Sequence, residues 1–374
     1  MPLRTNLIFW LVTLLVLVGA IVSISERSEV IEEVSLQKVF KDLENKLQDV
    51  HKISIKNREN AIDLSLKNKE WVLTDRNNFI ASEEVVKGLL LAVSELKLKE
   101  SKTSREELLP RLHVEDVSKK DSKSILLVLR DQKNKVIAEL NIGKEAEQMA
   151  GVTGMGRYVR KPDEKTAWLA EGNIEVFLDV NKWVNPKIIN ISKERIKQIT
   201  VIHKNDPIMT VVPVGDSSKK FKILNFPAGR EIEYQSDIDN MAEGLEDLEL
   251  EDVKQFSTEF LNKKGNINSQ YNTKDGLVIN VTAFEDKVGE FWGHFSVKAK
   301  DNVAKSVVDE AKAINSRVGK WVYSLPAHKY RYMTRKVEDV LKPLKKKTTK
   351  YSNLRPFLNN TLTFKFIYLI HRNF

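Results

Sequence analysis

Residues 51–73 read HKISIKNRENAIDLSLKNKEWVL, and apolar and polar side chains alternate through most of this stretch. A β-strand points successive side chains to opposite faces of its sheet, so alternation predicts half-buried strands. We therefore expect three short strands, at 51–56, 61–66 and 71–73. From Ser82 onward an apolar residue recurs every three or four positions, which predicts a helix with Ser82 as its N-cap.

A second stretch, displaced by roughly 150 residues, repeats this order of elements. Runs of strands with interspersed helices favour an α+β fold over a βαβ alternation. We therefore predict an α+β fold of two duplicated halves, residues 50–193 and 194–343, each of mainly antiparallel sheet with packed helices. The segments that support the second half are strands at 199–203, 208–214 and 221–224, helices from near Ser236 and at about 301–317, and the closing Lys-Trp-Val at 182–184 and 320–322.

Residues 7–24, LIFWLVTLLVLVGAIVSI, form a stretch without a charged side chain. A helix of this length spans about 27 Å, close to the roughly 30 Å hydrocarbon core of a bilayer. We therefore expect one N-terminal transmembrane helix within residues 1–25 that remains uncleaved. A cleaved signal peptide is the alternative, because small residues at 23 and 25 offer a cleavage site. The anchor residues expected in the lipid are Leu7, Phe9, Trp10, Leu14, Leu17, Ile21 and Ile24.

The orientation of this span is not determined by the charges beside it, because Arg4 precedes it and Arg27 and Lys38 follow it. The chain has no cysteine, which excludes a disulfide scaffold and a thiol nucleophile. A single anchor before a large cysteine-free body favours an external body. We expect a single-pass protein of the bacterial inner membrane with its body facing the periplasm.

Residues 26–49 connect the anchor to the body, and we predict that they include an amphipathic helix at 35–49. Its apolar residues recur at helical spacing and would pack on the first sheet. They are Leu36, Val39, Phe40, Leu43 and Leu47.

The net charge of +9 is concentrated at the C-terminus. From Lys342 onward the chain has eight basic residues and no acidic one, which leaves 53 basic against 52 acidic residues elsewhere. The body is therefore nearly neutral, and no nucleic-acid partner is expected. The tail at 344–374 is a candidate for contact with phosphates or anionic lipid headgroups. Its candidate anion contacts are Lys345, Lys346 and Lys347.

The sequence offers little catalytic chemistry. None of the six histidines lies in a metal-binding motif, and we assign no catalytic residue, metal ligand or cofactor. A glycine-dense stretch at 151–157 lacks the strand and helix context of a phosphate-binding loop, so we interpret it as a turn. Beside it, Arg157, Arg160 and Lys161 are candidate anion contacts.

The pattern of these elements resembles a family of bacterial membrane-anchored proteins, the domain of unknown function 4340. The resemblance covers about residues 1–343 and leaves the basic tail outside. It implies an envelope protein that assists gliding-type ABC transporters, and it carries no catalytic residues. The segments that carry it are 39–40, 50–55, 71–73, 125–129, 140–144, 157–160, 183–184 and 321–326.

Three functions are consistent with the sequence. The first is a single-span envelope protein with an external binding or scaffold body, which the resemblance implies is an accessory subunit of such a transporter. The second is an envelope hydrolase that acts on cell-wall polymer, which would need a pocket with converging acid, base or metal groups. The third is a protein that binds anionic surfaces through its basic tail. The oligomeric state stays open.

Overall fold

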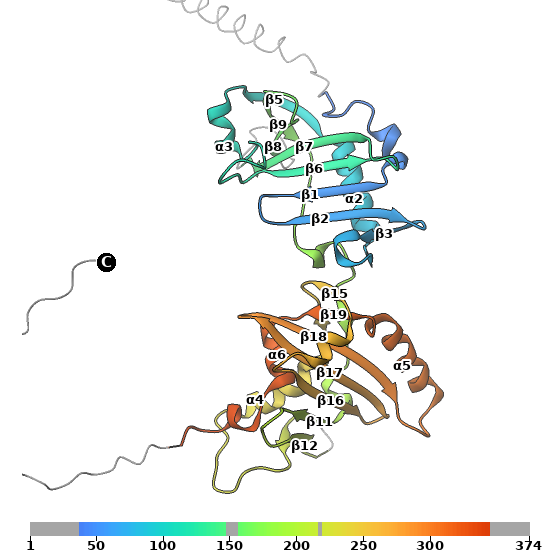
Figure 1. Cartoon of the computed structure of the whole chain (residues 1–374), viewed down its shortest axis with the longest axis vertical. Coiled ribbons are helices and arrows are strands. Elements are labelled where there is room, and N and C mark those ends of the chain that lie inside the picture. Colours follow the sequence, from blue (N-terminus) through green and yellow to red (C-terminus); the bar gives the residue numbers. More distant parts are fainter. Residues whose placement is uncertain (1–36, 147–155, 216–218, 345–374) are drawn as a thin grey trace, which may run out of the picture.

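The computed structural model describes residues 37–146, 156–215 and 219–344. It has two halves, each built on one large antiparallel sheet, placed one after the other along the longest axis (Figure 1). The predicted α+β class with mainly antiparallel sheet is therefore confirmed. No helix in the described part of the chain is long and apolar enough to cross a membrane. The predicted span at 7–24 and the tail from residue 345 onward lie outside the described residues.

The first sheet has nine strands in the order β4-β3-β2-β1-β6-β7-β8-β9-β5. Ile53 and Ile55 of β1 are buried, and Ile53 lies opposite Leu64 of β2, which is buried on the same face. The polar residues between them point to the opposite face. The strands are β1 (Lys52–Lys56), β2 (Ala61–Lys67), β3 (Glu70–Leu73), β4 (Phe79–Ile80), β5 (Lys97–Thr103), β6 (Ile125–Arg130), β7 (Val136–Glu145), β8 (Gly156–Arg160) and β9 (Ala167–Glu171).

Helix α2 (Glu83–Glu95) covers the buried face of this sheet. The Ser82 hydroxyl accepts a hydrogen bond from the Val85 backbone N–H at 3.5 Å, which confirms Ser82 as the N-cap. The buried side of the helix carries Val86, Leu89, Leu90 and Val93. The other helices of this half are short: η1 (Glu44–Asp49), η2 (Thr74–Arg76), η3 (Glu106–Leu108), α3 (Leu109–Leu112) and η4 (Val180–Lys182), with η5 (Lys193–Arg195) at the start of the second half.

The prediction of a helix at 35–49 is wrong for residues 37–43. Among the described residues of this range, only Glu44–Asp49 are helical, and they form the 3-10 helix η1. The Val39 N–H instead donates to the Leu96 carbonyl at 2.8 Å, and the Leu98 N–H donates to the Gln37 carbonyl at 2.8 Å. Because this backbone hydrogen-bonds to the start of β5, it cannot form the first turns of a helix. Val39 and Leu43 are nevertheless buried in the core, as the apolar spacing predicted.

The second sheet has eight strands in the order β13-β12-β11-β16-β17-β18-β19-β15. This order repeats the order of the first sheet, with β11 to β13 in the places of β1 to β3 and β15 to β19 in the places of β5 to β9. The second sheet has no strand in the place of β4. A separate two-stranded sheet pairs β10 (Lys187–Ile189) with β14 (Leu248–Glu249). The strands of the second sheet are β11 (Ile196–Ile202), β12 (Met209–Pro213), β13 (Phe221–Ile223), β15 (Val253–Gln255), β16 (Ile267–Thr273), β17 (Leu277–Lys287), β18 (Glu290–Ala299) and β19 (Trp321–Ser324).

The helices of the second half, except η7, pack on one face of its sheet. The helix predicted near Ser236 is α4, which continues as the 3-10 helix η6 and buries Met241 and Leu245. The helix predicted at 301–317 is α5, which buries Val307 and Ala311. The bounds of these helices are α4 (Gln235–Asp239), η6 (Asn240–Leu245), η7 (Thr258–Asn262), α5 (Lys305–Val318), α6 (Ala327–Thr334) and η8 (Val337–Val340).

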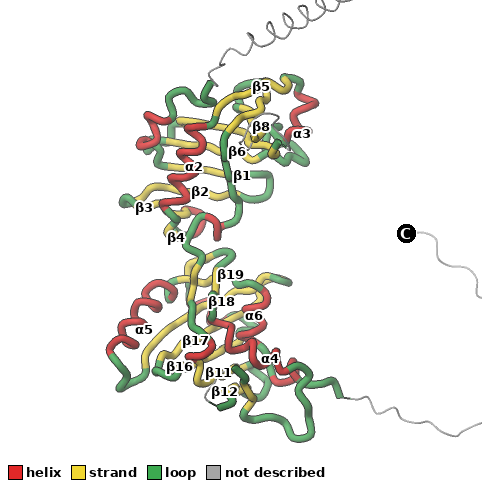
Figure 2. The backbone as a smooth tube through the Cα atoms, turned by 180° about the vertical axis from the view of Figure 1, so that it is seen from behind, coloured by secondary structure: helices red, strands yellow, loops and turns green. Residues whose placement is uncertain are grey.

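The helix-covered faces of the two sheets lie on the same side of the molecule. Helices α2 and α6 lie behind their sheets in Figure 1 and in front of them in Figure 2. The opposite faces, which we call the open faces, therefore point in a common direction. Part of the second open face is covered by η7, where Phe256 and Phe260 pack on Phe284 and Trp292.

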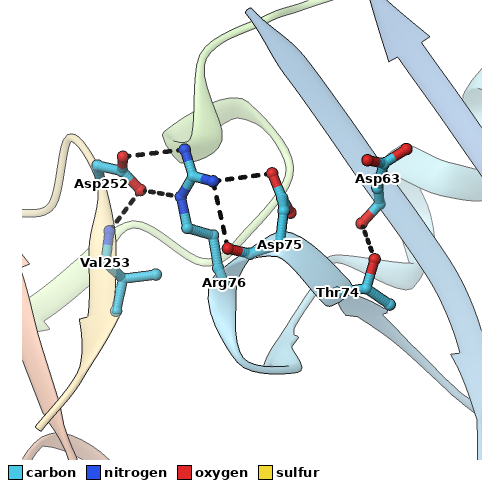
Figure 3. Close-up of polar contacts among 6 residues, drawn as sticks. All are labelled: Asp63, Thr74, Asp75, Arg76, Asp252 and Val253. Atoms are coloured by element: carbon cyan, nitrogen blue, oxygen red, sulfur yellow. Dashed lines mark hydrogen bonds and ion pairs between the residues drawn. The ribbon is translucent and has the colours of Figure 1, made fainter.

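An arginine joins the two halves at their junction (Figure 3). Arg76 of η2 donates from Nε to Asp252 Oδ1 at 2.6 Å and from Nη2 to Asp252 Oδ2 at 3.1 Å. It also donates from Nη1 to Asp75 Oδ2 at 2.8 Å. Burial raises the pKa of Asp75 despite the neighbouring arginine. Beside this network, the rings of Phe79 and Trp321 meet edge to face at 4.8 Å.

Candidate functional site

The open face of the first sheet contains a hollow of about 520 Å³ over β1, β2 and β6. We call it the basic groove, because Lys52, Lys56, Lys67 and Arg130 line it together with a single carboxylate, Asp63. Strand alternation puts all five side chains on the face away from α2. The other lining residues are Ile53, Ser54, Leu64, Ser65, Thr74, Val128 and Asn134.

Three of the four cations of the basic groove, Lys52, Lys67 and Arg130, have neutral hydrogen-bond partners. Lys52 Nζ donates to Asn134 Oδ1 at 3.3 Å, and Arg130 Nη1 donates to the Asn134 carbonyl at 3.2 Å. Lys67 Nζ donates to Asn78 Oδ1 at 2.7 Å. Within the described residues, no ion pair joins any of the four cations to a carboxylate. The groove can therefore attract anionic groups at close range.

The open face of the second sheet has a different character. Thr200, Gln270, Asn280 and Ser296 lie directly opposite one another in one row across β11, β16, β17 and β18. Gln270 Nε2 donates to Asn280 Oδ1 at 2.9 Å. This row presents hydroxyl and amide groups and no charge, so it can offer neutral hydrogen bonds.

A second hollow, of about 430 Å³, lies beside the first described residues of the chain. We call it the N-terminal groove, and its lining includes Lys161 and Trp168. The Trp168 Nε1 atom is buried and has no hydrogen-bond partner within the described part of the protein. Lys161 Nζ pairs with Glu164 Oε1 at 3.0 Å and lies 5.5 Å from the centre of the Phe40 ring. This lysine is thus engaged by a carboxylate and an aromatic ring.

The candidate anion contacts on β8 also have partners. Arg157 Nη2 pairs with Glu145. Arg160 is only 7% exposed, and it donates to the Val114 carbonyl at 2.8 Å and the Glu164 carbonyl at 2.9 Å. It also donates to the carbonyls of Lys161 and Pro162. The structure therefore gives Arg160 the role of tying the 161–164 turn to the residues that precede β6.

Several predicted residues lie outside the described part of the chain. They are the membrane anchor residues Leu7, Phe9, Trp10, Leu14, Leu17, Ile21 and Ile24, the tail lysines Lys345, Lys346 and Lys347, and most of the glycine-dense stretch.

Three of the described histidines, His51, His203 and His294, lie within hydrogen-bond distance of backbone carbonyls. His203 Nε2 lies 2.7 Å from the Thr334 carbonyl, and His294 Nδ1 lies 3.0 Å from the Trp321 carbonyl. Burial lowers the pKa of His294, although the hydrogen bond to Trp321 opposes this shift. In the described ranges, no group of three or more histidine, aspartate or glutamate residues could hold a metal ion.

The basic groove was not predicted, although the sequence contains part of its signal. In KISIK (52–56) and DLSLK (63–67), every polar residue is two positions from the next. That period places Lys52 and Lys56 on one face and Asp63 and Lys67 on one face of the next strand. The contribution of Arg130 could not be predicted from local sequence, because Arg130 of β6 pairs with Lys52 of β1, which is 78 positions away in the chain.

Comparisons with known proteins give one match. The family model described as "Domain of unknown function (DUF4340)" matches residues 71–266, slightly more than half of the chain. No curated protein and no solved structure matches. The matched region begins at the start of β3 and ends just before β16, so it includes most of the first half and the junction with the second. The chain therefore belongs to the family of proteins that contain the domain of unknown function 4340.

Proposed function

We propose that this chain is a single-span protein of the bacterial inner membrane whose body faces the periplasm and serves as a binding scaffold. One observation carries the proposal: the longest helix of each half, α2 or α5, packs on one face of its sheet, and the two other faces, which α3 and η7 cover only in part, point in a common direction (Figures 1 and 2). A large partner can approach both faces at once. The cations of one face and the amides of the other supply different contacts to such a partner.

We also infer that the two halves arose by duplication. Support comes from the order of the strands, since eight strands of the second sheet follow the path of their counterparts in the first. The two copies then diverged on their open faces. A duplicated scaffold of this kind offers two surfaces of different chemistry on one framework.

A finer proposal concerns the partner. We propose that the body serves as an accessory subunit of a gliding-type ABC transporter assembly, a role that rests on the family resemblance described from the sequence. In this role the N-terminal anchor would hold the body beside the transporter, so that a modest affinity of the open faces is strengthened by a high local concentration.

Affinity purification of the full chain from native membranes in a mild detergent tests this function. We expect a transporter component to be recovered with the chain in a fixed ratio. The matched control joins residues 1–36 to an unrelated soluble domain and should recover none of it. Recovery of no transporter component by the full chain, or equal recovery by the control, would contradict the proposal.

A further inference from the structure

The charges of the basic groove follow the register of its strands. Lys52 of β1 lies directly opposite Arg130 of β6, and both belong to one row across the sheet. Two residues further along β1, Ser54 lies opposite Asp63, and two residues beyond that comes Lys56. Along the strand direction the groove thus carries positive, negative and positive side chains, about 6.8 Å apart at a rise of about 3.4 Å per residue.

The fold itself does not require these charges. Like charges directly opposite each other on neighbouring strands are destabilising, and Lys52 and Arg130 form such a pair. The second sheet has the same strand order, and on its open face the pairs Gln198–Asn272 and Thr200–Gln270 of β11 and β16 are uncharged. Lys52 and Arg130 therefore lie side by side at some cost to stability, an arrangement that suits the binding of an anionic group.

The single carboxylate narrows the class of ligand. A uniform polyanion, such as a phosphate polymer or an anionic lipid surface, would be repelled by Asp63 in the middle of the groove. An extended polypeptide places side chains i, i+2 and i+4 on one face at the same spacing as the groove. Acidic side chains at i and i+4 with a basic one at i+2 would complement its three rows.

We propose that the basic groove binds an extended acidic segment of a partner protein with the pattern acid-x-base-x-acid. The proposal deepens the scaffold function and rests on it, because it assigns one of the two open faces to a peptide of stated charge pattern. The acids are held by Lys56 and by Lys52 with Arg130, and the base pairs with Asp63.

Two synthetic peptides of equal composition test the pattern. The first is Ser-Glu-Ser-Lys-Ser-Glu-Ser, and the second, Ser-Lys-Ser-Glu-Ser-Glu-Ser, has the same net charge in a permuted order. Both are titrated into the full chain in neutral-detergent micelles and followed by microscale thermophoresis. We expect the first to bind more tightly by about fivefold or more, roughly the equivalent of one well-placed charge pair. Asp63→Asn should remove this preference.

A matched pair of variants tests the location. Lys56→Gln with Arg130→Gln should weaken binding of the first peptide by about tenfold or more. Lys222→Gln with Lys298→Gln, which removes the same charge from exposed positions of the second sheet, should leave it unchanged.

The proposal is overturned if both peptides bind equally or not at all, or if the control pair weakens binding as much as the groove pair. Tighter binding of polyphosphate, or of vesicles rich in anionic lipid, would also overturn it by assigning the groove to a uniform anion. None of these results depends on recovery of a transporter component, so failure here is distinguishable from failure of the scaffold function.

Discussion

The junction between the two halves provides a sharp energetic prediction. Arg76 and Asp252 are 176 positions apart in sequence and are joined by two hydrogen bonds, with 26% and 32% of their side chains exposed. Fully exposed ion pairs contribute about 0.2–1 kcal/mol. Hydrogen bonds to charged groups in less exposed settings contribute about 1.5–3 kcal/mol. Because this pair is partly exposed but bidentate, we expect a coupling free energy of about 1–2 kcal/mol.

A double-mutant cycle with Arg76→Gln and Asp252→Asn measures this coupling in residues 37–344. Urea unfolding is followed by the fluorescence of tryptophans in both halves, including Trp183 and Trp292. Since the pair joins the halves, its loss should also separate their unfolding transitions.

The control cycle uses Arg230 and Glu338, whose Nη2 and Oε2 atoms are 3.2 Å apart within the second half. Glu338 is 64% exposed, so we expect a coupling of about 0.5 kcal/mol or less. A coupling between Arg76 and Asp252 no greater than that of the control would refute the assigned role of the junction.

Three further outcomes follow from particular residues. Arg160→Leu should lower the free energy of unfolding by about 2–4 kcal/mol in thermal or urea denaturation, because buried carbonyls lose their donor. Arg157→Gln on the same strand should lower it by less than about 1 kcal/mol. Similar losses for both variants would contradict the structural role of Arg160. Because burial lowers the pKa of His294, the unfolded chain takes up a proton at a higher pH than the folded chain, so stability should fall as the pH drops below about 6.5. His294→Gln should flatten this part of the pH profile, and an unchanged profile would show that other groups cause it. The chain has no cysteine, and Val288 is fully exposed. If the body faces the periplasm, the Val288→Cys variant in intact spheroplasts should therefore react with a membrane-impermeant maleimide. Reaction only after lysis would place the body in the cytoplasm.

Local patterns predicted many of the strands and one helix N-cap of this protein. The alternation at 51–56 and the N-cap at Ser82 depend on neighbours in sequence, so both could be read directly. The apolar spacing at 35–49 predicted which residues are buried but not the backbone. There, hydrogen bonds between Gln37, Val39 and the start of β5 replace the helix, and such non-local pairing leaves no local signal.

The sites were harder to predict than the fold, because charge alone does not reveal burial. Arg160 stood beside a glycine-rich turn and suggested an anion contact, yet it is buried among backbone carbonyls. The basic groove needs Arg130 next to Lys52, a neighbourhood created only by the pairing of β1 with β6. The order of the strands in the sheet brings together side chains that are far apart in the sequence, and a single sequence does not reveal that order.

We propose that an open sheet face, and not the helix-covered side, binds a partner in the envelope. Photo-crosslinking in living cells tests it directly, with p-benzoylphenylalanine placed at Glu70 or at Leu91. Glu70 is exposed and lies opposite Lys67 at the edge of the basic groove, whereas Leu91 is 50% exposed on α2. If the open face binds the partner, we expect a discrete crosslinked product from Glu70 and none from Leu91. The same product from both positions, or a product from Leu91 alone, would contradict it.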